Sequence, residues 1–325
     1  MRIGVTGAAS FLGGRLLHRL VESRGPSNVL ALDIVAPPAA LHVPHRFVDL
    51  TEPASDQRLL DMLREEKIET LVHLAYLTGP RRDASYAHEL ESIGTLSVLA
   101  AAAAAGVRHV VIRSFTAVYG ALGRNPSFLT EDRPLQASAA LAWVRDKLEA
   151  EQHAASFAKR YPRMVVTVLR FAPLFGPGVS TFYTRLFDKR VVPMLMGYDP
   201  LVQLLHPDDA LAAAEAALSC PSAGAFNVVP SGSIPLGAAL HLAAKVPVAV
   251  PHPLAYAASD LLWSAGLAEA PGGFVDYARY PFVADGAKAR RELGFQARYT
   301  SRDALMSYLR YRHPREDARP REVRV

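Results

Sequence analysis

Short apolar runs and longer helical patterns alternate along the first half of the chain. The short runs, rich in β-branched and aliphatic residues, are residues 2–5, 29–33, 71–74, 110–113 and 165–170. The amphipathic or alanine-rich helical patterns are residues 12–23, 55–66, 87–105 and 139–159. Strands that alternate with helices form βαβ units and a parallel sheet. The pattern therefore predicts an α/β fold with a Rossmann-type doubly wound parallel sheet.

The alternation ends near residue 176. Residues 191–201 and 231–273 are rich in proline, glycine and apolar residues, which indicates a smaller C-terminal substrate lobe. Residues 208–218 and 281–295 are expected to return to the main domain. We therefore expect a Rossmann domain over residues 1–175, the lobe with its returning segments over 176–310, and a basic tail over 311–325.

Composition favours a globular cytoplasmic protein. Hydrophobic residues make up 50% of the chain and charged residues 21%, which is enough to bury a core. Cys220 is the only cysteine, so no intramolecular disulfide can form, and no Cys/His cluster has metal-ligand spacing. An apolar run leads directly into a glycine turn at the N-terminus, and no apolar stretch is long enough to span a bilayer. We expect neither a metal site nor a membrane span.

The net charge of +5 is concentrated at the C-terminus. Residues 310–325 hold six arginines against Glu316, Asp317 and Glu322, so this segment supplies +3 of the total. The rest of the chain is nearly balanced, and no nucleic-acid partner is expected. The tail itself is either a solvated terminus or a contact for RNA, anionic lipid or an acidic partner.

A glycine turn joins the first predicted strand to the first helix. Residues 6–13 read TGAASFLG, and the N–H groups at the start of the helix can face a pyrophosphate. Gly7 permits the tight turn and Gly13 permits close packing of the helix. Ser10 takes the place of the middle glycine of a T-G-x-x-G-x-x-G pattern, where its side chain crowds a phosphate but can also donate a hydrogen bond to it. The turn predicts dinucleotide binding.

An acidic residue follows at the distance that this kind of site needs. Asp33 ends the second predicted strand, about 20 positions after the turn. Its carboxylate can accept hydrogen bonds from the adenine ribose and would repel a 2′-phosphate, and no arginine follows it closely. This favours NAD over NADP. The alternative is that Asp33 only caps the end of the strand.

Further segments occur in the order typical of the extended short-chain dehydrogenase/reductase family, and the chain resembles its NAD-dependent epimerase/dehydratase branch. Residues 48–50 (VDL) resemble the adenine-side motif of that family, and residues 71–75 (LVHLA) resemble its H-L-A-A segment. Residues 93–95 fit N-V-x-G-T, with Glu91 at the asparagine position, and residues 114–120 fit S-S-x-x-V-Y-G. Residues 169–178, 205–209 and 289–295 match later motifs. The resemblance implies an NAD site formed by Gly7, Ser10, Phe11, Leu12, Gly13, Asp33, Asp49, Leu50, Leu74, Ala75 and Lys147.

The catalytic motif of the resembled family is incomplete here. Members usually carry Y-x-x-x-K, in which the lysine holds the nicotinamide ribose and the tyrosine exchanges a proton. Lys147 matches the lysine, whereas Trp143 stands at the tyrosine position and Phe115 at the position of the second serine. An indole N–H is only a donor, so Trp143 cannot replace the tyrosine. Lys147 either binds the ribose or is a solvated helix residue.

Nearby hydroxyls offer a replacement for the missing groups. Ser114 and Thr116 are expected to face away from the Phe115 side if the segment is extended, and Tyr119 belongs to the structural V-Y-G element. Thr116 is kept as a weak candidate. The isolated histidines, including His73 and His206, are expected to be structural.

The substrate motifs also differ from those of the resembled family. Nucleotide-sugar epimerases have an asparagine and an arginine where this chain has Pro173 and Val202, so nucleotide sugars are not expected as substrates. Apolar residues 191–196 and 261–263 suit an apolar ligand, a partner surface or the core of the lobe.

Two kinds of function remain open. One is an epimerase, dehydratase or reductase that acts on an unidentified, apolar small molecule. The other is a non-catalytic NAD-binding sensor or scaffold, and the fold alone does not choose between them. The resemblance also implies a homodimer formed through the helices near residues 87–105 and 139–159.

Overall fold

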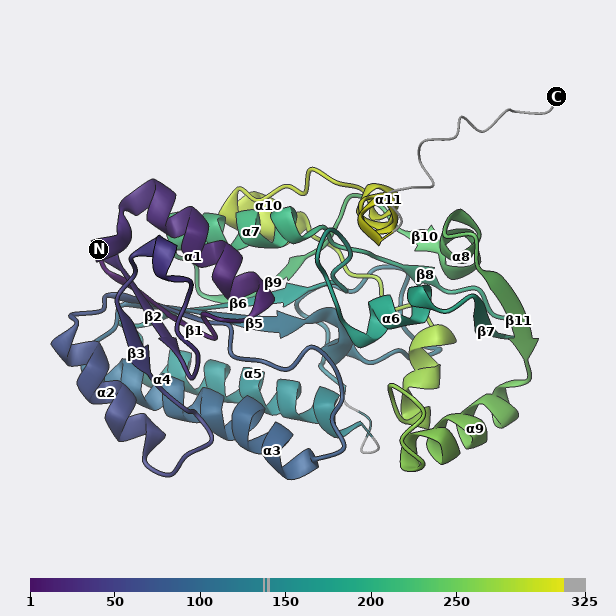
Figure 1. Ribbon diagram of the computed structural model, residues 1–325, viewed down its shortest axis with the longest axis horizontal. Helices are drawn as coiled ribbons and strands as arrows, with labels where there is room; N and C mark the ends of the chain where they lie inside the picture. Colours follow the sequence, from purple (N-terminus) through teal and green to yellow (C-terminus); the bar gives the residue numbers. More distant parts are fainter. Residues whose placement is uncertain (137, 139–140, 313–325) are drawn as a thin grey trace.

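A seven-stranded sheet lies at the centre of the computed structural model, which describes residues 1–136, 138 and 141–312 (Figure 1). Its strands are β1 (Ile3–Thr6), β2 (Val29–Asp33), β3 (His45–Phe47), β4 (Thr70–His73), β5 (His109–Phe115), β6 (Val165–Phe171) and β9 (Gly224–Val228). Every neighbouring pair is parallel, in the order β3-β2-β1-β4-β5-β6-β9. The prediction of a doubly wound parallel sheet is confirmed.

Helices cover both faces of the sheet (Figure 1). One face carries α1 (Phe11–Arg24), α7 (Pro207–Ser219) and α10 (Ala287–Leu293). The other carries α2 (Ser55–Glu65), α3 (Ala84–His88), α4 (Gly94–Ala105) and α5 (Ala142–Arg160). Buried leucines of α1 and α2, among them Leu16 and Leu59, pack onto the two sides of the aliphatic strands. Because helices bury both faces of the sheet, the strands carry apolar side chains on both faces.

The strand order reverses between β1 and β4. The chain proceeds outward from β1 to β2 and β3, and then returns to the other side of β1 to form β4. In such a sheet a ligand crevice opens at the carboxyl ends of the strands where the order reverses. This is where β1 meets the glycine turn, so the fold places the predicted dinucleotide motif at the expected edge.

A smaller lobe lies beside the sheet (Figure 1). Its elements are α6 (Phe182–Asp188), β7 (Val191–Leu195), β8 (Leu201–Val202), β10 (Ile234–Pro235), α8 (Leu236–Leu242), β11 (Val246–Val250), α9 (His252–Ser264), η5 (Gly272–Ala278) and α11 (Ser301–Arg312). Phe175, Phe187, Leu240 and Tyr308 belong to its own apolar core. Between β8 and β10 the chain leaves the lobe to supply α7 and β9, so the lobe is built from separate segments.

Two of the predicted helices differ in detail. The predicted helix over residues 87–105 is the end of α3, a π-helical turn η3 (Glu89–Ile93) and then α4. The helix predicted over residues 139–159 begins at Ala142, and residues 139–140 lie outside the described residues, as do residues 313–325 of the tail. Short 3₁₀ turns complete the inventory: η1 (Pro26–Asn28), η2 (Ala39–Leu41) and η4 (Thr116–Tyr119).

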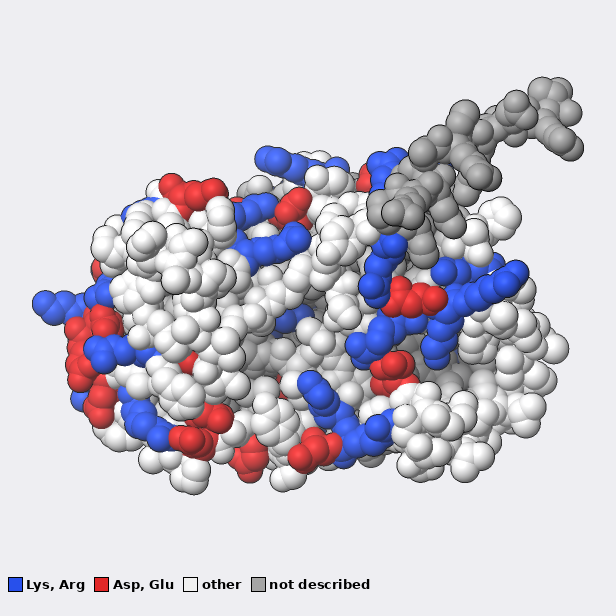
Figure 2. Space-filling view, viewed as in Figure 1, with Lys and Arg blue, Asp and Glu red and all other residues white. Residues whose placement is uncertain are grey.

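Several basic side chains gather in the right half of the face shown in Figure 2, with a few acidic ones among them. Basic and acidic side chains lie next to one another there, with uncharged areas between them. No described helix combines the length and the apolar character needed to cross a bilayer.

Candidate active site

Two glycines of the first turn are required by close packing. Gly7 has a φ of 69°, and a Cβ on it would lie 2.4 Å from the backbone nitrogen of Ala75. A Cβ on Gly13 would lie 2.0 Å from the carbonyl oxygen of Gly7. Any side chain at either position would push the turn away from the end of β4 or from the helix. The turn therefore keeps the close backbone approach that a dinucleotide site uses.

The backbone conformation at Ser10 does not require a glycine. Its φ of −67° and ψ of 162° are ordinary extended values, and its Oγ accepts a hydrogen bond from the Gly13 N–H at 3.1 Å. Ser10 is thus the N-cap of α1. Within the described residues the Phe11 and Leu12 N–H groups have no hydrogen-bond acceptor. These donors and the positive end of the helix dipole fit a phosphate.

Asp33 connects the end of β2 to the glycine turn. Its Oδ2 accepts from the Ala9 N–H at 2.9 Å and its Oδ1 from the Val35 N–H at 3.1 Å. Asp33 therefore does cap the strand, and it does so next to the phosphate turn. Capping and ribose binding do not exclude each other, because a carboxylate has about four acceptor positions.

Four other predicted cofactor residues lie at the ends of β3 and β4. The Asp49 carboxylate accepts from the Thr51 N–H and Oγ at 2.9 and 2.7 Å. Leu50 and Leu74 are buried, and the Leu74 N–H donates to the Thr6 carbonyl at 3.0 Å, which extends the pairing of β4 with β1. Ala75 follows it, against Gly7. Their contact with a cofactor stays a prediction.

Lys147 is enclosed rather than solvated. Its side chain is 2% exposed and its ammonium forms an ion pair with Glu91, which is fully buried. The ammonium also lies 4.5 Å from the ring centre of Tyr76, 5.0 Å from Phe115 and 5.4 Å from Trp143. Burial lowers the pKa of Lys147 well below its ordinary value. The alternative of a solvated helix lysine is wrong, whereas a ribose contact stays a prediction.

Glu91 is a site residue whose role sequence reasoning missed. It was noticed only as a departure from the motif asparagine, yet it supplies the counter-charge of Lys147. Its Oε1 also accepts from the Leu77 N–H at 2.7 Å, which fixes the segment after β4. Lys147 lies far from Glu91 in the sequence, so the residues around Glu91 gave no indication of this pair.

A narrow, largely apolar cavity, part of which is open to solvent, lies beside Phe115 and Trp143, the two rings that Lys147 contacts. It is lined by Thr78, Arg113, Phe115, Thr116, Ala117, Trp143, Phe171, Pro173, Leu174, Thr181, Tyr183 and Phe282. Phe115 and Trp143, the two aromatic residues that the resemblance predicts at the usual hydroxyl positions, are neighbours, with ring centres 5.5 Å apart. Phe182 and Phe274, from the lobe side, pack on Trp143 at 5.6 and 5.9 Å. The cavity thus lies between the sheet and the lobe.

The hydroxyls near Phe115 are arranged differently from the expectation. Ser114 does face away, where its Oγ donates to Glu151. Thr116 lines the same cavity as Phe115, so the expectation for this residue was wrong. The reason is that β5 ends at Phe115 and η4 begins at Thr116, which breaks the alternation of an extended strand. Tyr119 is structural, since its hydroxyl donates to Asn227 and accepts from Arg170 at 2.8 and 2.7 Å.

The cavity wall holds donors but no side chain that titrates near neutral pH. Its lining includes no Asp, Glu, His or Lys among the residues described. Burial lowers the pKa of Arg113 to about 10, which leaves the guanidinium charged at neutral pH. Burial raises the pKa of the Tyr183 hydroxyl well above its usual value, so it stays protonated. The wall can donate hydrogen bonds, but it offers no general base.

His73 and His206 have structural partners. His73 Nδ1 lies 2.6 Å from the Thr6 hydroxyl and its Nε2 3.2 Å from that of Thr95. Burial, and secondarily the charge of Lys147, lowers the pKa of His73 to about 3, so the ring is neutral. His206 caps α7 by accepting from the Asp208 N–H at 3.2 Å.

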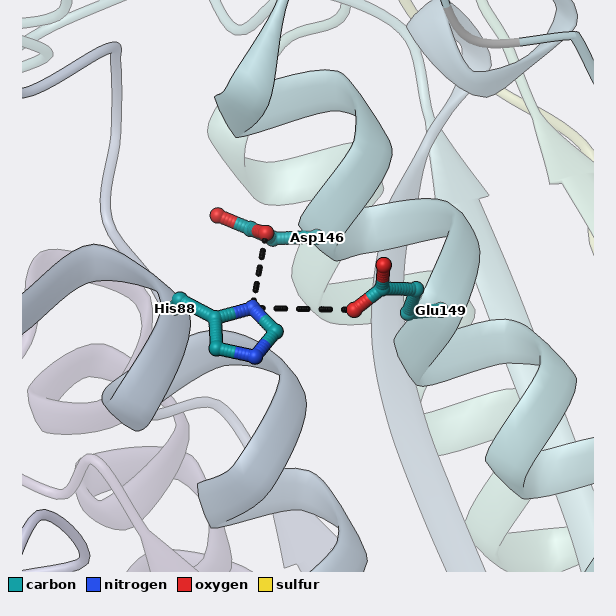
Figure 3. A group of neighbouring side chains, drawn as sticks. All are labelled: His88, Asp146 and Glu149. Carbon is teal, nitrogen blue, oxygen red and sulfur yellow. Dashed lines mark hydrogen bonds and ion pairs between the residues drawn. The ribbon is translucent and has the colours of Figure 1, made fainter. Parts of the chain in front are cut away.

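One group of side chains has the composition of a metal site. Figure 3 shows His88 of α3 between Asp146 and Glu149 of α5, with its Nδ1 3.0 Å from Asp146 Oδ1 and 3.6 Å from Glu149 Oε2. Sequence spacing did not indicate this group because His88 lies on another helix. Asp146 is hydrogen-bonded to His88 and Glu149 to Ser92, so the contacts are those of a hydrogen-bonded network that joins α3 and η3 to α5.

Comparison with known proteins assigns the family. The model of the NAD dependent epimerase/dehydratase family matches residues 3–228, and the chain belongs to this family. An uncharacterized protein of Mycobacterium tuberculosis is 33% identical over 312 residues, which cover 95% of this chain and 83% of that protein. A 3-diazoavenalumate denitrifying reductase of a Streptomyces species is 31% identical over 243 residues, covering 70% of this chain and 75% of the reductase.

Solved structures share the fold. MoeE5 in complex with UDP-glucuronic acid and NAD has a TM-score of 0.75 at 24% identity, covering 97% of this chain and 99% of that one. The UDP-glucose 4-epimerase of Thermotoga maritima has a TM-score of 0.75 at 18% identity, with the same coverage. The cofactor of this chain is NAD, as predicted, in agreement with the family, with its NAD-bound neighbours and with the donors of the glycine turn.

Proposed function

We propose that this protein is an NAD-dependent reductase of small, planar, apolar compounds, and that its reaction uses no proton from a protein side chain. The observation that carries the proposal is the cavity wall. By motif resemblance Trp143 and Phe115 stand at the two usual hydroxyl positions. Their rings lie 5.5 Å apart, and no described lining residue is a general base. Bound NADH supplies a hydride.

The direction of reaction follows from this wall. Oxidation of an alcohol requires removal of the hydroxyl proton, and loss of a positioned acid or base forfeits about 10²–10⁴-fold in rate. Addition of a hydride to an electron-poor carbon needs no such base. The donors of Arg113, Trp143 and Tyr183 can also stabilise negative charge on a substrate oxygen.

The Streptomyces relative supports a particular subclass. Its name describes reductive loss of nitrogen from a diazo compound. When a hydride adds at the carbon of an aryl diazonium ion and dinitrogen leaves, the products are an arene, dinitrogen and the oxidised nicotinamide, and no proton is consumed. A site without a tyrosine loses nothing in such a reaction. Nucleotide sugars fit poorly, because Pro173 stands in the cavity wall at the asparagine position.

Isotope transfer tests the proposal. The purified protein is mixed with NADH that carries deuterium at C4 and with benzenediazonium, and parallel reactions use unlabelled NADH in heavy water. We expect NADH to be oxidised and deuterium to reach the arene only from the labelled cofactor. UDP-glucose with NAD serves as the matched substrate control and should not react.

Two results would contradict the proposal. One is deuterium that enters the product from solvent alone, since this places proton transfer in the step. The other is NAD binding without oxidation of NADH by any electron-poor aryl probe, which would favour the non-catalytic alternative. The Trp143→Phe variant should keep turnover within a few-fold, because an indole supplies no titrating group.

A further inference from the structure

Arg113 is a buried cation without an acidic partner. The residue is 3% exposed, lies on β5 and lines the cavity. Its Nε is buried without an acceptor, and among the described residues it takes part in no ion pair. Its guanidinium carbon lies 4.6 Å from the ring centre of Phe115. An aromatic face offsets only part of the cost of burying a charge.

The other buried cations of this region are compensated. Arg170, on the neighbouring strand β6, donates from Nε and Nη2 to the Glu151 carboxylate at 3.0 and 2.6 Å. Lys147 has Glu91. Of these three buried cations, Arg113 alone has no acidic partner among the described residues.

Two further buried donors also lack a hydrogen-bond acceptor. The Trp143 indole N–H and the Tyr183 hydroxyl line the cavity, and neither has a hydrogen-bond partner. A buried polar group without a partner costs about 1–3 kcal/mol, so three in one wall call for a common acceptor. The remaining wall combines apolar residues, among them Phe171, Leu174 and Phe282, with the threonines Thr78, Thr116 and Thr181.

We propose that the cavity binds an organic monocarboxylate, whose carboxylate pairs with Arg113 and whose planar apolar body lies among the aromatic side chains. A guanidinium presents two parallel N–H groups that match a carboxylate. A phosphate dianion would need more than the single cation that the described lining supplies. This inference rests on the proposed function for the nature of the site and adds the acidic group of its ligand.

Binding measurements test the pairing without any turnover. The NAD-loaded protein is titrated calorimetrically with 2-naphthoate and with the neutral 2-naphthamide. We expect the acid to bind about 10- to 100-fold more tightly, as charge-assisted hydrogen bonds in a buried site require. Arg113→Met should remove this preference, leave amide binding unchanged and leave NAD affinity unchanged. Arg113→Lys should keep part of the preference.

A matched control and a stability readout separate binding from folding. Arg185→Met removes an arginine of α6 that pairs with Glu269 at the surface, and it should leave the preference intact. Because Arg113 has no counter-charge, Arg113→Met should unfold at the same or a higher temperature than the wild type. A merely structural arginine would instead lower that temperature.

Three outcomes would overturn the inference. These are equal affinities for acid and amide, an acid preference that survives in Arg113→Met, and a loss of NAD affinity in that variant equal to its loss of acid affinity. The third would assign Arg113 to the cofactor. Failure of the proposed reductase activity is seen separately, as bound naphthoate with no oxidation of NADH by any aryl probe.

Discussion

Replacement of Glu91 by glutamine should reveal how much the buried ion pair with Lys147 contributes to the free energy of unfolding. The amide oxygen can still accept the Leu77 N–H, so the Glu91→Gln change removes mainly the charge opposite Lys147. Because the Lys147 side chain is 2% exposed and Glu91 fully buried, solvent cannot replace the lost partner. Breaking a buried pair on one side costs about 3–5 kcal/mol.

Thermal unfolding measures this loss of stability as a fall in Tm. An unfolding entropy of about 2.1 cal/mol/K per residue over 325 residues converts that loss to a fall in Tm of about 4–7 °C. The matched control is Glu65→Gln, which removes an exposed partner of Arg46, and its effect should stay below about 1 kcal/mol.

The pH dependence of the loss of stability in Glu91→Gln (the deficit) provides a second test. Burial lowers the pKa of Lys147 below its value in the unfolded chain, and loss of Glu91 must lower it further. Between the folded and unfolded pKa values the unfolded chain holds a proton that the folded chain lacks, so stability rises with pH. The loss of stability in Glu91→Gln should therefore shrink as the pH rises from the folded-state pKa of Lys147 in the variant to that in the wild type, and it should stay constant at higher pH. A deficit below about 1 kcal/mol at neutral pH, or one that grows with pH, would refute the reasoning.

Three other predictions follow, two from the cofactor site and one from the substrate cavity. Calorimetry should show tighter binding of NAD(H) than of NADP(H), and Asp33→Asn should narrow the difference; equal affinities for the wild type would remove Asp33 from the ribose site. Gly13→Ala should weaken NAD binding by at least about tenfold, because its Cβ would lie 2.0 Å from the Gly7 oxygen. Gly14→Ala in the same helix, whose Cβ would meet only the Ala8 carbonyl oxygen at 3.7 Å, should bind NAD like the wild type. No epimerisation of a UDP-hexose should be detected by product chromatography, and measurable turnover would restore the nucleotide-sugar assignment.

The sheet and its glycine turn were predictable because their causes are local. Apolar runs of strand length, Gly7 before a helix and Asp33 at the next strand end are all read within a few residues. The structure places them where βαβ geometry requires, and Ser10 is tolerated because the backbone there is ordinary. The spacing of the Y-x-x-x-K motif also predicted Trp143 beside Lys147, whereas Phe115 was assigned to the same site only by the resemblance.

The remaining features of the site depend on contacts between distant residues. Glu91 and Lys147 are 56 positions apart, and only the folded arrangement of η3 and α5 brings them together. Thr116 turned toward the cavity because a 3₁₀ turn replaced an extended segment. Arg113 stood in the sequence as one polar residue at the end of an apolar strand, and its lack of an acidic partner could not be known before every neighbour was placed.

The interrupted path of the chain has a practical consequence for dissecting the protein. β9 reaches the sheet only after the chain has built β7 and β8, and it pairs with β6 from Thr167↔Gly224 to Phe171↔Val228. A fragment that stops at residue 175 would leave the backbone of β6, with the sequence VVTVLRF, as an unprotected sheet edge. Such an edge recruits other strands and leads to aggregation. Isolated expression of the N-terminal half should therefore give insoluble material, whereas a fragment that continues through α10 closes that edge.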